Sequence, residues 1–207
     1  MVGEIWHTDR RARRRRDPDR PERILAAAAR LAAGRGFHTV GMAEIGSEAG
    51  IVGSGVYRHF ASKEAILIAL LDRGMTRLES GAAAALRHAS SDQEALFLLV
   101  RDYAEVALTH RAELTVYHRE SHTLPDEHRR SLRRRQRHYV EEWVHTLAPL
   151  RQDLSDAELR LAVHAATGAI QSTLFFRSGL TPELLTERLV GMAHGCLGVV
   201  PYSVNPN

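Results

Sequence analysis

The 207-residue chain contains one cysteine, Cys196, so it cannot form a disulfide within itself. We interpret Cys196 as a buried structural thiol and expect a reducing, cytoplasmic setting. The longest strongly apolar run, residues 65–71, is far too short to span a bilayer. Trp6 and His7 precede a run of arginines and not an apolar stretch, so we expect no secretory leader and no membrane partner.

Lysine is almost absent, since 27 arginines accompany the single Lys63. This ratio is typical of biased codon usage, so arginine content alone says little about function. The placement of charge says more. Residues 1–60 carry 11 Lys and Arg against 7 Asp and Glu, a net charge of +4, whereas residues 61–207 carry 17 against 18, a net charge of −1, which together give +3. The N-terminal part therefore has the basic excess that a surface facing DNA phosphates requires.

The sequence shows no strand-like alternation, no nucleotide-binding glycine loop and no internal repeat, and apolar residues recur at helical spacing throughout. We therefore predict an all-α fold. Capping residues, early prolines and acidic first turns mark where helices begin. The predicted starts are Asp19, Ser62, Ser91, Pro125, Ser155 and Thr181, with a shorter helix over residues 111–121.

Residues 42–60 predict a helix-turn-helix. A short helix pattern over residues 42–49 ends at Gly50, which permits the positive φ of a tight turn. A second short helix over residues 53–59 is too polar and too rich in glycine to be pure core. The second helix of such a motif can enter the major groove of DNA.

Residues 20–63 resemble the N-terminal DNA-binding domain of the TetR family of bacterial transcriptional regulators. The resemblance is carried by an apolar first helix that includes Ile24 and Ala28, by residues 49–51 at the turn, and by the string Tyr57-Arg58-His59-Phe60 followed by Ser62-Lys63-Glu64. The chain departs from the family pattern at Gly41, where Thr or Ser is usual, and at Val52, where a Ser usually caps the recognition helix. The resemblance implies a helix-turn-helix domain over residues 19–63 and a helical effector-binding and dimerisation domain over residues 64–200.

Several residues are candidates for contact with double-stranded operator DNA. Near the start of the second helix, Ser54 has a hydroxyl for a base edge or phosphate, and Gly55 leaves room for DNA to approach the bare main chain. The resemblance places Tyr57, His59 and Lys63 at phosphates, whereas Arg58 is open between phosphate and solvent. We interpret Phe60 as a packing residue.

Residues 1–18 lack helical periodicity and hold a run of arginines. We expect a disordered basic arm in the DNA-free protein. Arg13 and Arg14 would follow the phosphate backbone or enter the minor groove on binding.

Two stretches near the C-terminal end are rich in small residues, which let helices approach closely. The resemblance implies a homodimer in which these stretches form a four-helix bundle, and two recognition helices together would read a palindromic operator. A monomer whose small residues pack internally is the alternative. The small residues are Ala162, Ala165, Ala166, Gly168, Ala169, Gly191, Ala193 and Gly195.

A group of aromatic and polar residues in the second half has the composition of a pocket for a small-molecule effector. Its layout is similar to that of actinobacterial family members responsive to lipids or acyl-CoA. The alternative is that the aromatics are core and that Arg119 and Glu120 are a solvated pair. The candidate ligand-binding residues are Tyr117, Arg119, Glu120, Trp143, Gln171 and Phe175.

A cluster of arginines between residues 129 and 137 lies largely opposite the apolar stripe of its predicted helix. A solvated face is one interpretation, and contact with coenzyme A phosphates is the other.

No motif points to catalysis or to a cofactor. His118 and His122 stand four residues apart, a spacing that could place two imidazoles on a metal, but no Glu follows His118 as in His-Glu-x-x-His. We therefore predict neither an enzyme nor a metalloprotein. The leading hypothesis is a TetR-type regulator, most simply a repressor released by a small hydrophobic or acyl-CoA-like molecule. The alternative is a helical small-molecule or metal-binding protein without specific DNA binding.

Overall fold

The computed structural model describes residues 19–51 and 53–201, which fold entirely into α-helices, short 3-10 turns and loops. This agrees with the predicted all-α fold. The nine α-helices of this part of the chain are α1 Arg20–Arg35, α2 Met42–Glu48, α3 Gly53–Val56, α4 Lys63–His88, α5 Asp92–Thr109, α6 Arg111–Glu120, α7 Asp126–Leu147, α8 Asp156–Gln171 and α9 Pro182–Leu197.

Most helices begin where their capping residues predict. The hydroxyl oxygens of Ser62, Ser91 and Thr181 accept hydrogen bonds from the backbone N–H groups three residues on, at 3.0, 3.2 and 3.4 Å. Ser155 and Glu158 form a complete capping box. At Ser91 only half of such a box forms, because the carboxylate of Glu94 accepts from the N–H of Ser90 and not from that of Ser91.

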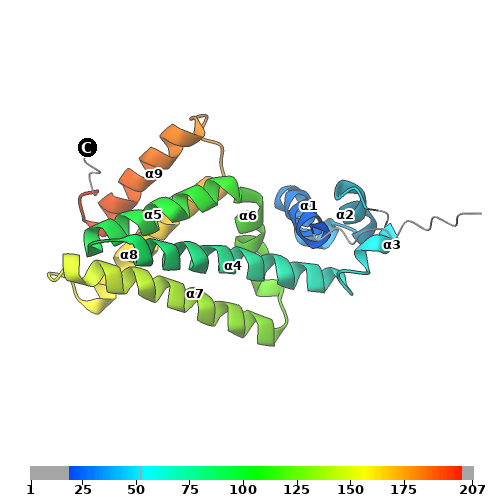
Figure 1. Cartoon of the computed structure of the whole chain (residues 1–207), viewed down its shortest axis with the longest axis horizontal. Coiled ribbons are helices and arrows are strands. Elements are labelled where there is room, and N and C mark those ends of the chain that lie inside the picture. Colours follow the sequence, from blue (N-terminus) through cyan, green and yellow to red (C-terminus); the bar gives the residue numbers. More distant parts are fainter. Residues whose placement is uncertain (1–18, 52, 202–207) are drawn as a thin grey trace, which may run out of the picture.

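The helices form two groups joined by α4 (Figure 1). Helices α1, α2 and α3 lie together at one end, and α4 runs from them into a larger bundle made with α5 to α9. Ile66, Leu70 and Met75 on α4 are almost completely buried. Since α4 contacts α1 as well as α5, α6 and α7, it links the two groups mechanically.

The two groups also meet where α6 packs on α1. An ion-paired cluster lies in this contact: Arg73 of α4 pairs with Glu22 of α1 at 2.7 Å and with the buried Glu113 of α6 at 2.9 Å. One arginine therefore joins three helices. Arg77 adds a longer contact to Glu113 at 3.7 Å.

Cys196 corrects an expectation from the sequence, because its side chain is exposed on α9 and not buried. Its neighbour His194 takes the inward position and is 1% exposed. The reason is helical geometry: residues two positions apart face different sides, and α9 is covered on one side only.

Candidate functional site

The turn between α2 and α3 forms as the sequence predicts. Gly50 has φ of 68°, and its N–H donates to Ser47 O at 3.0 Å. Ile45 and Ile51 are buried on either side of the turn. A glycine is required at position 50 because side chains rarely adopt this backbone conformation.

The second helix is shorter than predicted, since α3 covers Gly53–Val56 and residues 57–59 form a turn. Helix-like hydrogen bonds continue from the N–H groups of His59 and Phe60 to Val56 O, at 2.9 and 3.0 Å. Two glycines in four residues explain the short helix, because glycine is a poor helix former.

The segment that follows α3 presents a row of side chains to solvent. Tyr57 is 58% exposed, and Arg58 and His59 are exposed beside it, whereas Phe60 packs against the core. The segment lies at the end of the molecule remote from the helical bundle (Figure 1). A hydroxyl, a guanidinium and an imidazole are therefore available together on one protruding turn.

Gly55 has a different structural reason from the one predicted. A Cβ at this position would lie 2.6 Å from Cγ2 of Ile51, inside the protein. The bare Cα therefore allows α3 to pack on the preceding turn, and this packing explains the glycine without DNA. Ser54 lies within α3, and Arg13, Arg14 and Val52 fall outside the described residues.

Lys63, the first residue of α4, already has partners within the protein. Its ammonium donates to His38 O at 2.7 Å and lies 5.2 Å from the ring centroid of Phe37. An ammonium has three N–H donors, so these contacts leave capacity for a phosphate. Lys63 ties α4 to the 3-10 turn Phe37–Thr39 that follows α1.

The six candidate ligand residues lie in three different places. Tyr117 and Gln171 line a cavity of about 120 Å³ enclosed by α4 to α8. Trp143 does not reach it; its ring is fully buried behind Tyr103 and Tyr139, with centroids 6.0 and 6.2 Å away. Trp143 therefore does not line this cavity, because its ring is buried in the core of the bundle.

Arg119 and Glu120 also lie away from this cavity. The guanidinium of Arg119 donates to Ala33 O at 2.9 Å, and the carboxylate of Glu120 accepts from the Phe37 N–H at 2.8 Å. Arg119 also lies 6.0 Å from the ring centroid of Phe175, which is 55% exposed. Arg119 and Glu120 connect the bundle with the helix-turn-helix group and do not line this cavity.

Tyr103 and Tyr139 also line the cavity, and neither is among the candidate ligand residues identified from the sequence. Both are buried, and Gln171 donates to the Tyr103 hydroxyl at 2.7 Å. Burial raises the pKa of Tyr103 to about 12 and that of Tyr139 well above its ordinary value. A signal was present in the sequence: a buried tyrosine in a stripe of leucine and alanine has a hydroxyl that needs a partner.

The cavity wall consists of apolar and polar side chains, two of them histidines, His118 and His164. Burial lowers the pKa of His118, which favours its neutral form, and none of the lining residues is Asp, Glu, Lys or Arg. Among the described residues, no group of three or more His, Cys, Asp or Glu side chains could hold a metal ion, and no helix is long and apolar enough to cross a membrane.

A helix-turn-helix with a solvent-facing second element, joined by one long helix to a bundle with an internal cavity, defines the architecture of a ligand-responsive helix-turn-helix regulator. Two family models match the chain: bacterial regulatory proteins of the tetR family over residues 24–70, and the tetracyclin repressor-like C-terminal domain over residues 89–193. The chain belongs to the TetR family of bacterial regulators.

Known relatives agree with this assignment. The HTH-type transcriptional activator FasR of Mycolicibacterium smegmatis is 35% identical over 88 residues, which are 42% of this chain and 40% of FasR. The chain thus aligns with less than half the length of that curated relative.

Solved structures extend the similarity in fold over most of the chain. AibR in complex with isovaleryl coenzyme A and operator DNA has a TM-score of 0.70 at 25% identity, covering 84% of this chain and 97% of AibR. The ketosteroid regulator KstR2 of Mycobacterium tuberculosis has a TM-score of 0.75 at 22% identity, covering 85% and 93%.

Proposed function

We propose that the protein is a one-component transcriptional regulator that binds a palindromic operator as a homodimer and changes its affinity for DNA when a small molecule fills the bundle. The observation that carries this proposal is the protruding Tyr57-Arg58-His59 turn behind the helix-turn-helix. Phosphate contacts need such exposed donors, and the net positive charge of residues 1–60 favours approach to DNA. The alternative of a helical binding protein without DNA affinity gives no reason for that turn.

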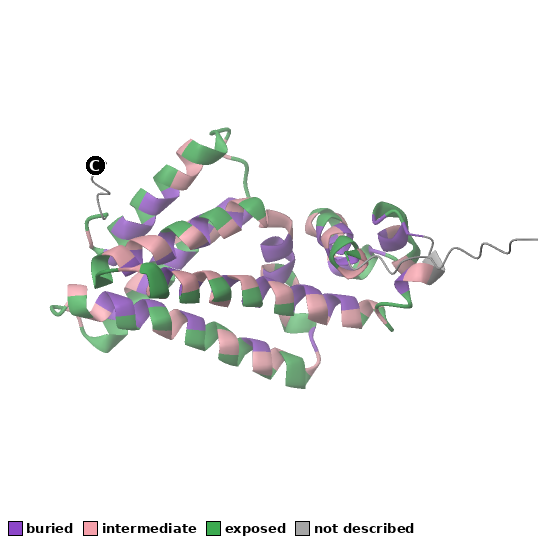
Figure 2. Ribbon diagram, in the orientation of Figure 1, coloured by how far each residue is buried: buried purple, intermediate pink, exposed green. Residues whose placement is uncertain are grey.

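The proposed dimer would form through α8 and α9. Leu161 is 70% exposed on α8 and Met192 is 59% exposed on α9, although both are large and apolar. Gly168, Gly191 and Gly195 have open space where a side chain would lie. Figure 2 shows exposed residues along much of α9. Apolar side chains beside small residues suit a closely packed helical partner, and a second copy places two recognition elements on one duplex.

Effector binding would reach the DNA-binding helices through α6. Tyr117 and His118 line the cavity, and the next two residues, Arg119 and Glu120, bond to Ala33 and Phe37. A ligand that prefers one position of α6 would therefore bias the position of α1 and of the turn that follows it. The distance between the two recognition elements of the dimer is the quantity that this bias would change.

The proposed role is not catalytic, and the protein would act in the cytoplasm, where it meets the chromosome. Repression is our first choice for the direction of regulation. Activation is a second candidate, because the curated relative FasR is named a transcriptional activator. Transcript levels in a deletion strain decide between them: derepression of the neighbouring genes supports a repressor, and loss of their transcripts supports an activator.

Footprinting on the DNA upstream of the protein's own gene tests the function itself. We expect symmetric protection on both strands, with half-sites in successive major grooves about 34 Å apart or a small multiple of that spacing. Uniform weak protection with no preferred sequence would argue for the alternative function.

A further inference from the structure

A second, smaller space lies beside the cavity of the bundle and shares two lining residues with it. This outer cleft, of about 70 Å³, is lined by Tyr117, Ser121, His122, Arg129, Leu132, Arg133 and Gln136. Tyr117 and Gln136 line both spaces, so these two side chains stand between them. The inner cavity and the outer cleft together make one site with two compartments.

The inner cavity suits a compact, uncharged body with one hydrogen-bonding atom. Its volume of about 120 Å³ is close to that of engineered cavities that bind benzene. Met75, Leu78, Leu114 and Val140 supply apolar wall. Tyr139 is 6% exposed, and its hydroxyl makes no hydrogen bond of normal geometry within residues 19–51 and 53–201; the nearby indole N–H of Trp143 can donate to the hydroxyl oxygen but leaves the hydroxyl proton without an acceptor. A buried hydroxyl is costly to leave unpaired, so it favours a ligand oxygen or water in the cavity.

The outer cleft suits an anion. Arg129 and Arg133 both line it, and no acidic residue does. Arg133 is exposed and makes no hydrogen bond or ion pair with any described residue, whereas Arg129 is held by Asp126 at 2.5 Å. Glu79 of α4 is paired with Arg135 at 2.6 Å. Arg133 is therefore the available cation in the outer cleft.

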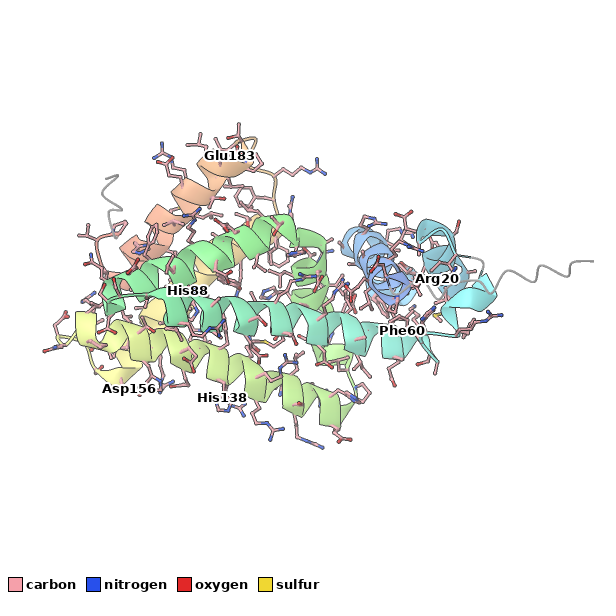
Figure 3. All side chains as sticks on the ribbon, in the orientation of Figure 1. Arg20, Phe60, His88, His138, Asp156 and Glu183 are labelled. Atoms are coloured by element: carbon pink, nitrogen blue, oxygen red, sulfur yellow. The ribbon has the colours of Figure 1, made fainter. Side chains whose placement is uncertain are left out.

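The arginines of α7 do not all face this cleft. Arg130, Arg134 and Arg137 line neither space and are exposed. Figure 3 shows the neighbouring His138 on the outer side of α7, away from α4 and α5. The helix thus carries two populations of arginine, and the sequence pattern alone does not separate them. This difference supplies a matched control for Arg133.

From this geometry we infer that the effector is a small organic carboxylate, with its ring or short chain in the inner cavity and its carboxylate on Arg133. The regulatory role of this ligand rests on the proposed function, whereas binding of the carboxylate does not depend on it. The two compartments share walls, so the anionic group must lie within a few bonds of the apolar body. A free acid meets that condition, whereas the phosphates of a coenzyme A thioester lie beyond a long pantetheine arm.

Calorimetric titration of the full chain without DNA tests the inference. The ligands are benzoate, phenylacetate, cyclohexanecarboxylate and hexanoate, each paired with its neutral amide, and then benzoyl coenzyme A and palmitate. We expect at least one acid to bind and its amide to bind ~10-fold or more weakly, because a charge-assisted contact is lost. Benzoyl coenzyme A and palmitate are expected to bind more weakly than the best acid.

Substitutions test which side chains bind the carboxylate and the apolar body of the ligand. Arg133→Gln is expected to weaken the best acid ~10-fold and to leave its amide unchanged, whereas Arg134→Gln, with the same loss of charge on the same helix, leaves both unchanged. Tyr139→Phe is expected to weaken acid and amide alike, severalfold. Circular dichroism and the melting temperature check that each variant folds.

Four outcomes would overturn the inference. No acid binds, an amide binds as tightly as its acid, or only the thioester or palmitate binds. The fourth is that Arg133→Gln and Arg134→Gln change the affinity for the acid by the same factor. Its failure differs from failure of the proposed function. Operator binding without carboxylate binding removes the inference alone. Arg133-dependent carboxylate binding without operator binding removes the proposed function and leaves the binding site.

Discussion

The carboxylate of Glu120, at the end of α6, accepts a hydrogen bond from the backbone N–H of Phe37 at 2.8 Å, 83 residues earlier in the chain. The same short turn is held from its other side by Lys63, whose ammonium lies over the Phe37 ring and donates to His38 O. The turn is thus clamped between the end of the helix that borders the cavity and the start of the helix that leads to DNA. A change in the position of Glu120 or of Lys63 should therefore alter the position of the other residue through this turn.

Glu120→Ala should weaken the coupling between effector and DNA while leaving each binding event in place. The substitution removes a charge-assisted hydrogen bond, worth about 2 kcal/mol at most, and frees the Phe37 N–H. We expect effector affinity to be unchanged and the effector-induced change in operator affinity to shrink severalfold. Fluorescence anisotropy of labelled operator with and without effector measures this. Glu127→Ala, an exposed acid at the start of α7, is the control; an equal effect of both substitutions would remove Glu120 from the coupling.

Lys63→Ala tests whether the Lys63 ammonium contacts a DNA phosphate in addition to holding the turn at Phe37. If it contacts a phosphate, operator affinity falls for all sequences and the slope of log K against log salt flattens by about one unit. A role limited to the turn would lower the melting temperature with an unchanged slope. Salt titrations of the variant and the parent protein, each on specific and random DNA, separate the two roles.

Arg73→Met should destabilise the fold more than Glu22→Gln. Arg73 is the cation between Glu22 and the buried Glu113, so its loss leaves the Glu113 carboxylate in the α1–α6 contact with only the longer contact to Arg77, at 3.7 Å. Removing one partner of a buried pair costs about 3 kcal/mol, whereas Glu22 is largely exposed and its loss costs about 0.5 kcal/mol. Chemical denaturation of both variants checks the order, and equal free energies of unfolding would contradict a buried network.

Asp102→Asn should stabilise the protein at neutral pH and not in acid. Burial, with Glu105 nearby, raises the pKa of Asp102 from 3.8 to about 6, and one carboxylate oxygen has no hydrogen-bond partner among the described residues. A raised carboxyl pKa means that the folded state prefers the protonated form. The stability that this preference contributes is full below about pH 4 and is lost as the pH rises through 6.

Asparagine mimics the protonated acid at every pH, so the gain should be on the order of 1 kcal/mol at pH 7 to 8, after allowance for solvent screening, and should vanish near pH 4. Melting temperatures across this range give the comparison. A gain that is the same at all pH values would point to packing against Gly81, whose missing side chain makes room for the Asp102 carboxylate.

Most of the fold could be predicted from local signals in the sequence. Ser62, Ser155 and Thr181 mark helix starts that the structure shares, and Gly50 adopts the positive φ predicted for the turn. These features depend on neighbours within four residues, so the sequence displays them directly. The all-α class follows from the same kind of local pattern.

The candidate effector site was only partly predictable, because its walls come from five helices. Tyr117 and Gln171 were identified by composition, but nothing local shows that Trp143 faces the core or that Glu120 reaches Phe37. Those outcomes depend on how α6 packs on α1 and how α7 rotates about its axis. The sequence pattern likewise treats Arg133 and Arg134 alike, although only Arg133 lines the cleft.

The most direct test of the account is the stoichiometry and salt dependence of binding to a footprinted operator. Analytical ultracentrifugation with labelled DNA counts the protomers, and anisotropy over increasing salt gives the slope. We predict two protomers per palindrome, or two pairs, with affinity that falls steeply as salt rises and that drops when Tyr57 becomes Ala. A single protomer on DNA, or no sequence-preferring complex even at low salt, would contradict the claim that the exposed turn after α3 meets DNA in symmetric pairs.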